Sequence, residues 1–157
     1  MKIQFWSVGK AHETYIKQGV NEFTKRINHY YQAEWHILPT VKNAGSLPGP
    51  ELIMKEGEYI LNGLRKDDYL VVLDERGRQL SSGGLADLIQ SKANDNVKQL
   101  IFLIGGAYGI DEAVLKRSNF CWSLSLLVFP HQLVRLILAE QVYRACTIIR
   151  NEKYHHS

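Results

Sequence analysis

The sequence has only two cysteines, Cys121 and Cys146, and neither stands at metal-ligand spacing from the other or close to a histidine. This pattern argues against a zinc site and against a disulfide framework. Both thiols lie in apolar stretches, which predicts buried free cysteines of the kind found in a reducing compartment. We therefore expect a cytoplasmic protein without a bound metal.

Long hydrophobic runs are also missing. The longest, residues 124–129, is interrupted by Ser125 and stopped by Pro130, so it is far too short to span a membrane. The first residues lack the apolar core and cleavage site of a signal peptide. No Gly-Lys-Ser or Gly-Lys-Thr sequence is present, which argues against a Walker-type nucleotide hydrolase. We expect no association with a membrane.

The remaining composition is typical of one globular domain. The 157 residues are 45% hydrophobic and 22% charged, so a single domain spanning 1–157 can bury a sizeable core. The net charge of +3 permits an anionic partner such as RNA but is too small to demand one.

Strands and helices are expected to alternate along the whole chain. Short apolar runs predict strands, and apolar residues at spacings of three and four predict helices. The expected strands cover residues 3–8, 34–38, 69–73, 99–104 and 122–124. The expected helices cover residues 13–28, 50–64, 83–93, 111–117 and 131–150. Such alternation predicts an α/β fold with an open, mostly parallel sheet.

Three loops follow expected strands, at residues 74–78, 105–109 and 125–130. Ligands of parallel sheets bind at the carboxyl ends of the strands, so these loops are candidates for one pocket. The glycines of the second loop would let the backbone approach a ligand closely, although a tight turn explains them equally well. The third loop could clamp an adenine through its backbone, although a core strand leading into a helix explains it better when it is taken alone.

The closing helix is apolar around nearly its whole circumference. A helix that is apolar on every side is buried on every side. A chain of this size cannot easily surround its own last helix, so we expect a homodimer.

Several polar residues stand out on and after this helix. Arg135 lies in apolar sequence and needs an anion or an acceptor nearby, with a structural ion pair as the alternative. His131 could accept a proton, contact a phosphate or simply begin the helix. Glu140 and Arg144 are spaced to pair with each other. The tail Tyr154–His155 suits a nucleotide target, but chain ends are usually frayed.

Short motifs recur in a fixed order along nearly the whole chain. They are Lys2-Ile3-x-x-x-x-Ser7-Val8-Gly9-Lys10, Lys55-Glu56-Gly57-Glu58, Leu73 with Gly77, Leu80-Ser81-Ser82, Leu103-Ile104-Gly105-Gly106-x-x-Gly109, Arg117-Ser118-Asn119, Ser123-Leu124-Ser125-x-x-x-Phe129-Pro130-His131-Gln132-Leu133-x-Arg135, Glu140-Gln141-x-Tyr143-Arg144-Ala145 and Tyr154-His155. In this order and spacing the chain resembles the RlmH family, small ribosomal RNA methyltransferases of the SPOUT superfamily.

The resemblance implies a SPOUT-type α/β fold with helices on both faces of the sheet, a trefoil knot near the C-terminus and a homodimer. It implies transfer of a methyl group from S-adenosylmethionine to N3 of a pseudouridine in 23S ribosomal RNA. Carried over by position, the cofactor-binding residues are Leu73, Gly105, Leu124, Ser125, Leu126, Leu127, Val128 and Phe129.

The catalytic residues that we expect are Arg135, His131, Tyr154 and His155. Either histidine would accept the N3 proton, Tyr154 would stack on or orient the base, and Arg135 would stabilise the charge left on the ring. Because the modest net charge predicts weak binding to free RNA, an assembled ribosome is the expected substrate. The alternatives are a SPOUT enzyme with another RNA target, and a non-catalytic dimer that binds a nucleotide or a ribosome.

Overall fold

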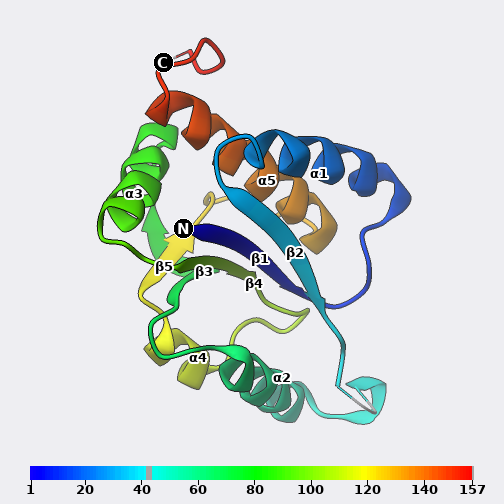
Figure 1. Ribbon diagram of the computed structural model, residues 1–157. Helices are drawn as coiled ribbons and strands as arrows, with labels where there is room; N and C mark the ends of the chain where they lie inside the picture. Colours follow the sequence, from blue (N-terminus) through cyan, green and yellow to red (C-terminus); the bar gives the residue numbers. More distant parts are fainter. Residues whose placement is uncertain (42–43, 157) are drawn as a thin grey trace.

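A five-stranded parallel sheet lies between two layers of helices in the computed structural model, which describes residues 1–41 and 44–156 (Figure 1). The elements in chain order are β1 (Lys2–Val8), α1 (Thr14–Ile27), β2 (Gln32–Leu38), the short 3-10 helix η1 (Ala44–Ser46), α2 (Gly49–Gly63), β3 (Tyr69–Gln79), α3 (Ser82–Asn94), β4 (Gln99–Ile104), α4 (Glu112–Arg117), β5 (Phe120–Ser123) and α5 (His131–Ile149). The strand order is β2-β1-β4-β3-β5. The predicted fold class is confirmed.

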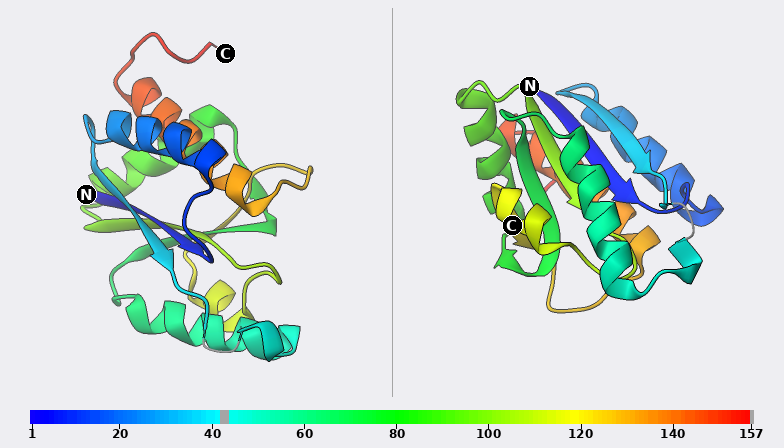
Figure 2. Two further views of the ribbon diagram at one scale, coloured as in Figure 1. Left: turned by 90° about the vertical axis from the view of Figure 1, so that its right-hand side faces the viewer. Right: turned by 90° about the horizontal axis from the view of Figure 1, so that it is seen from below.

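Helices α1, α3 and α5 cover one face of the sheet, and α2 and α4 cover the other (Figures 1 and 2). Both faces are therefore apolar, and central strands such as β4 are continuous apolar runs buried on both sides. Phe5 and Phe102 stack on the α5 side with ring centroids 5.9 Å apart, while Val72 and Leu103 belong to the core under α2 and α4.

Helix α5 packs between α1 and α3. Leu138 and Val142 face the sheet and are fully buried, whereas Leu133 and Ile137 are only half-buried in the single chain. The prediction that this helix is covered on every side therefore does not hold within one protomer, and the homodimer stays a prediction. Among the described residues, no helix is both long and apolar enough to cross a membrane.

The predicted loop at residues 74–78 is wrong, because β3 continues through it to Gln79. Its register against β5 shifts between Leu73 and Arg78, so the charged segment forms an irregular part of the strand. A Cβ on Gly77 would come within 2.5 Å of the Cys121 backbone, which explains the glycine there. The last strand begins at Phe120 instead of residue 122, so Cys121 lies in a strand and is half-buried rather than buried.

The other predicted elements match the observed ones within about two residues. Ser81 caps α3 by accepting a hydrogen bond from the Gly84 backbone N–H at 2.9 Å. The trefoil knot that the family resemblance implies stays a prediction.

Candidate functional site

The middle of β3, at residues 73–75, and the carboxyl ends of β4 and β5 meet around one cavity of about 410 Å³. The segments that the sequence singled out as strand-end loops thus come together at one edge of the sheet. The lining residues are Leu73, Asp74, Glu75, residues 104–110, Trp122, Ser123, Leu124, Ser125, Leu127, Val128, Phe129, His131 and Val134. The segment after β5 projects beyond the sheet and then leads into α5 (Figure 2).

The glycine loop after β4 is packed too tightly for side chains. A Cβ on Gly105 would lie 2.3 Å from the Ile110 Cδ1 atom, and one on Gly106 would lie 2.8 Å from both carboxyl oxygens of Glu56. Gly109 adopts a φ of +97°, a conformation that other residues rarely take. The tight turn and the close backbone approach to the cavity, which the sequence left as alternatives, are therefore features of the same loop.

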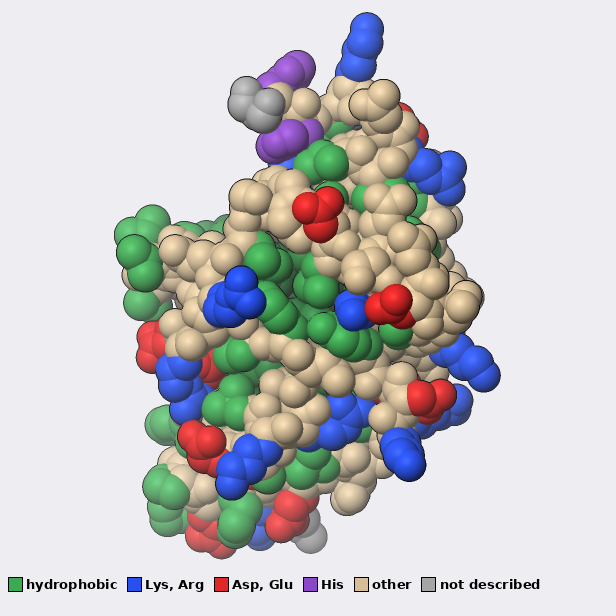
Figure 3. Space-filling model, turned by 90° about the vertical axis from the view of Figure 1, so that its left-hand side faces the viewer, with side chains coloured by type: hydrophobic (Ala, Val, Ile, Leu, Met, Phe, Trp, Pro, Cys, Tyr) green, Lys and Arg blue, Asp and Glu red, His purple; other side chains and the backbone are tan. Residues whose placement is uncertain are grey.

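The segment from residue 124 to 129 is held by Ser125. Its hydroxyl accepts a hydrogen bond from the Leu127 backbone N–H at 3.0 Å, and its carbonyl accepts one from the Ser123 hydroxyl at 3.1 Å. Leu126 does not line the cavity and is 89% exposed, and Val128 is 88% exposed. Figure 3 shows a face of the molecule on which apolar side chains line a hollow and others stand out on a projection. Of the predicted cofactor residues, only Leu126 thus points away from the cavity.

Trp122 and Asp74 also line the cavity; neither was predicted individually as a site residue, although Asp74 belongs to the candidate segment 74–78. Trp122 is 3% exposed, and its indole N–H is the single buried side-chain polar atom without a hydrogen-bond partner among the described residues. The Asp74 carboxylate pairs with Arg76 at 2.8 Å, and this hydrogen bond lowers the pKa of Asp74. In the described part of the chain, no three His, Cys, Asp or Glu side chains gather as a metal site.

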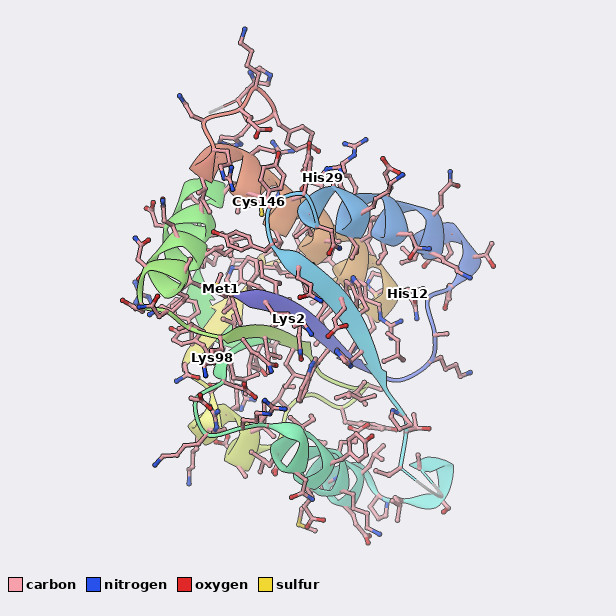
Figure 4. All side chains as sticks on the ribbon, viewed as in Figure 1. Met1, Lys2, His12, His29, Lys98 and Cys146 are labelled. Carbon is pink, nitrogen blue, oxygen red and sulfur yellow. The ribbon has the colours of Figure 1, made fainter. Side chains whose placement is uncertain are left out.

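Arg135 does not line the cavity but lies buried beside it. Its Nε donates to the Ser7 hydroxyl at 2.9 Å, and its Nη1 lies 3.2 Å from Nδ1 of His12. His12 sits at the end of the sheet opposite Met1 (Figure 4). Arg135 is 1% exposed and forms no ion pair with a carboxylate among the residues described, so the alternative of a structural ion pair is wrong.

This buried charge acts on its neighbours. Burial, together with the charge of Arg135, lowers the pKa of His131, which lines the cavity, while a hydrogen bond with the Gly105 backbone acts in the opposite direction. The same two causes lower the pKa of His12. Burial lowers the pKa of Arg135 itself. His131 therefore stays neutral near pH 7.

The tail lies at the far end of α5 from the cavity. The 19 residues of this helix rise about 28 Å, so His131 and the tail cannot meet within one chain. The predicted pair of Glu140 and Arg144 is confirmed, with Nε and Oε1 2.9 Å apart. It holds the tail: the Tyr154 hydroxyl donates to Glu140 at 3.2 Å, and Arg144 lies 3.3 Å from Nδ1 of His155.

Comparisons with known proteins agree on one family. Residues 1–155 match the family described as Predicted SPOUT methyltransferase. The chain is 45% identical to the ribosomal RNA large subunit methyltransferase H of Cytophaga hutchinsonii, over 99% of this chain and 100% of the relative. It is 42% identical to the protein of that name from Parabacteroides distasonis, over 99% of each.

Solved structures of lower identity share the fold. The crystal structure of tRNA (m1G37) methyltransferase from Aquifex aeolicus has a TM-score of 0.56 at 19% identity, covering 100% of this chain and 76% of that one. A probable methylase family protein from Haemophilus influenzae has a TM-score of 0.56 at 12% identity, covering 99% and 70%. By its family match over nearly all residues and its identity to full-length relatives, the chain belongs to the RlmH family of SPOUT methyltransferases.

Proposed function

We propose that the chain is an S-adenosylmethionine-dependent enzyme that methylates N3 of a pseudouridine in 23S ribosomal RNA. The observation that carries this proposal is the cavity between residues 73–75 of β3 and the ends of β4 and β5, in a chain whose relatives are named ribosomal RNA large subunit methyltransferase H. The substrate is the assembled ribosome, and the enzyme therefore works in the cytoplasm.

Three features of the cavity fit a cofactor of this size and polarity. Its volume of about 410 Å³ lies in the range of small-molecule sites. The backbone at Gly105 forms a wall without side chains, and Trp122 offers an unused N–H donor. Leu73, Gly105 and residues 124, 125 and 127–129 would hold the cofactor, whereas Leu126 lies outside the cavity. When bound, S-adenosylmethionine supplies a methyl group that its positive sulfur has already activated.

The protein must also position the acceptor nitrogen and remove its proton. His131 is the proton acceptor, because it lines the cavity and its lowered pKa leaves it neutral. Loss of the N3 proton spreads negative charge over the two adjacent carbonyl oxygens of the base. The positive charge of Arg135, one helical turn along α5 and shielded from water, stabilises that charge through space.

The tail completes the cavity of a second protomer. Tyr154 and His155 are held about one helix length from their own cavity, so only a homodimer brings them to a reacting base. Because Arg144 can only donate, Nδ1 of His155 accepts, and Nε2 is the ring nitrogen left to donate. His155 then donates a hydrogen bond to the base instead of accepting its proton, and Tyr154 stacks on the base.

The direct test is cofactor binding followed by methyl transfer. Calorimetry should show binding of S-adenosylmethionine, and labelled methyl should enter 23S RNA of ribosomes that lack the modification. Labelling confined to transfer RNA would favour another SPOUT target, and binding without transfer to any RNA class would favour a non-catalytic dimer. Equal rates on naked RNA and on ribosomes would contradict the assembled substrate.

Mixed dimers test the shared site. A Gly105→Val variant loses the cavity but keeps its tail, and a chain ending at residue 153 loses the tail but keeps its cavity. Each homodimer should be inactive, whereas mixing them should restore methylation, because one of the two sites in a mixed dimer then combines an intact cavity with an intact tail. Absence of any restored activity in verified mixed dimers would contradict the proposal.

A further inference from the structure

Helix α2 reaches the glycine loop from the face of the sheet opposite α5 (Figure 2). Glu56 and Gly57 are both buried on this helix. A Cβ on Gly57 would meet the Asp111 carboxylate at 2.7 Å, and a Cβ on Gly106 would meet both oxygens of Glu56 at 2.8 Å. Residues 105–111 are thus held between the cavity on one side and α2 on the other.

The Glu56 carboxyl has no partner in this position. It is 8% exposed, and it forms neither a hydrogen bond nor an ion pair with any residue in the described ranges. Burial raises the pKa of Glu56. The carboxyl oxygens are not among the fully buried polar atoms of the described residues, so water still reaches them. A carboxylate in such a largely enclosed position gains from any arrangement that supplies it with a protein donor.

The glycine loop lies beside this carboxyl and carries backbone N–H groups that could donate to it. The two carboxyl oxygens face Gly106, while the loop as a whole lines the cavity. Asp111 at the start of α4 and Tyr108 in the loop also face this region, and neither supplies a cation. On the cavity side, His131 is hydrogen-bonded with the Gly105 backbone of the same loop, so the Glu56→Gln variant is needed to separate its titration from that of Glu56. A small rotation of the loop backbone would satisfy the carboxylate and set the loop against a ligand.

We propose that Glu56 is a positioning residue: when the cofactor binds, its carboxylate accepts a backbone N–H from residues 106–108 and fixes the glycine loop against the cavity. This inference rests on the proposed cofactor site. It assigns a role to the Lys55-Glu56-Gly57-Glu58 motif, which the proposed reaction does not otherwise use. Because the bound state favours the ionised form, cofactor binding releases a proton from Glu56.

The direction in which cofactor affinity changes with pH follows from the release of the Glu56 proton. If the bound form holds Glu56 ionised, cofactor affinity is weakest at low pH, where the free protein carries the proton, and rises as Glu56 ionises. Calorimetry at about pH 4.5 and about pH 7.5 measures this for wild type, Glu56→Gln and the exposed neighbour Glu58→Gln. Wild type and Glu58→Gln should bind S-adenosylmethionine more tightly at the higher pH.

The Glu56→Gln variant should bind about tenfold more weakly at the higher pH and should lose the pH dependence, while its melting temperature stays close to that of wild type. If this variant bound with wild-type affinity and the same pH dependence, the proposed role of Glu56 would be overturned and the proposed function would stand. Failure of wild type to bind at all would overturn the proposed function and the inference with it.

Hydrogen exchange of the wild-type protein provides a test that needs no variant. The cofactor should slow amide exchange in a peptide covering residues 103–112. Binding without protection there would overturn the proposed hydrogen bond, even if the Gln variant failed to fold.

Discussion

The Arg135 guanidinium donates a hydrogen bond to the Ser7 hydroxyl at 2.9 Å, joining the second turn of α5 to the end of β1 across 128 positions in the sequence. Together with the contact to His12, this bond fixes the beginning of the helix against the central strands. Among the residues that the structure describes, no carboxylate forms an ion pair with this positive charge, which lies buried beside the cavity. The contact explains how Arg135 can influence His131 without lining the cavity itself.

Replacing Arg135 should affect both stability and turnover. Arg135→Ala leaves a cavity and two unsatisfied polar partners, so the free energy of unfolding should fall by about 2–5 kcal/mol in urea titrations. Arg135→Lys keeps the charge, whereas Arg135→Met keeps only the volume. At saturating cofactor, single-turnover methylation should therefore fall much less for Lys than for Met. Equal rates in these two variants would show that the positive charge at residue 135 does not contribute to methyl transfer.

The glycine loop should tolerate no side chain at Gly105. In Gly105→Ala the new methyl group would press on Ile110 and the Gly109 carbonyl, displacing the loop from the cavity. We expect the dissociation constant for S-adenosylmethionine to rise at least about tenfold in calorimetry. Gly45→Ala, where a Cβ would meet nothing within 4 Å, is the matched control and should bind normally. Normal binding by both variants would show that a side chain at residue 105 does not disturb cofactor binding.

The pH dependence of methyl transfer should report on His131. Its pKa is lowered from the ordinary value of 6.5, so the neutral acceptor form persists as the pH falls to 6.5 and is lost only below that. Single-turnover rates on ribosomes should therefore decline on the acid side with a midpoint below pH 6.5. His131→Gln should be slow at every pH and should lack the decline. A variant with wild-type rates would exclude His131 as the acceptor.

Alkaline stability should depend on Cys146. Burial raises the pKa of its thiol to about 12, whereas the unfolded chain ionises near the ordinary value of 9.0. The unfolded state therefore loses its proton first, and stability falls as the pH rises from about 9 towards 12. Denaturant titrations at about pH 8.5 and about pH 10.5 should show a smaller loss for Cys146→Ala than for wild type. An equal loss in both proteins would show that this thiol ionises as easily when folded.

Local patterns were enough to predict the layered fold. The continuous apolar runs of β4 and the first half of β3 indicate strands covered on both faces, and the helix periodicities place every major helix within about two residues. The second half of β3 could not be predicted in this way. Its charged residues are typical of a loop, and only its pairing with β5, through Arg78 and Gln79, extends the strand.

The parts of the candidate site that lie beside strand ends could be predicted from the sequence. Leu73, Gly105 and most of residues 124–129 surround the cavity because parallel strands end at a common edge. Trp122 was missed because a tryptophan inside a strand is most often core, and its unused N–H is visible only in three dimensions. Arg135 was correctly expected to need an acceptor, but no spacing rule connects it to Ser7 at the other end of the chain.

The most direct measurement is transfer of labelled methyl from S-adenosylmethionine to purified ribosomes that lack the modification, followed by mapping of the labelled nucleoside. One methyl group per ribosome, on N3 of a pseudouridine in 23S RNA, is the predicted result. Label in another RNA, or no label from protein that binds the cofactor normally, would contradict it.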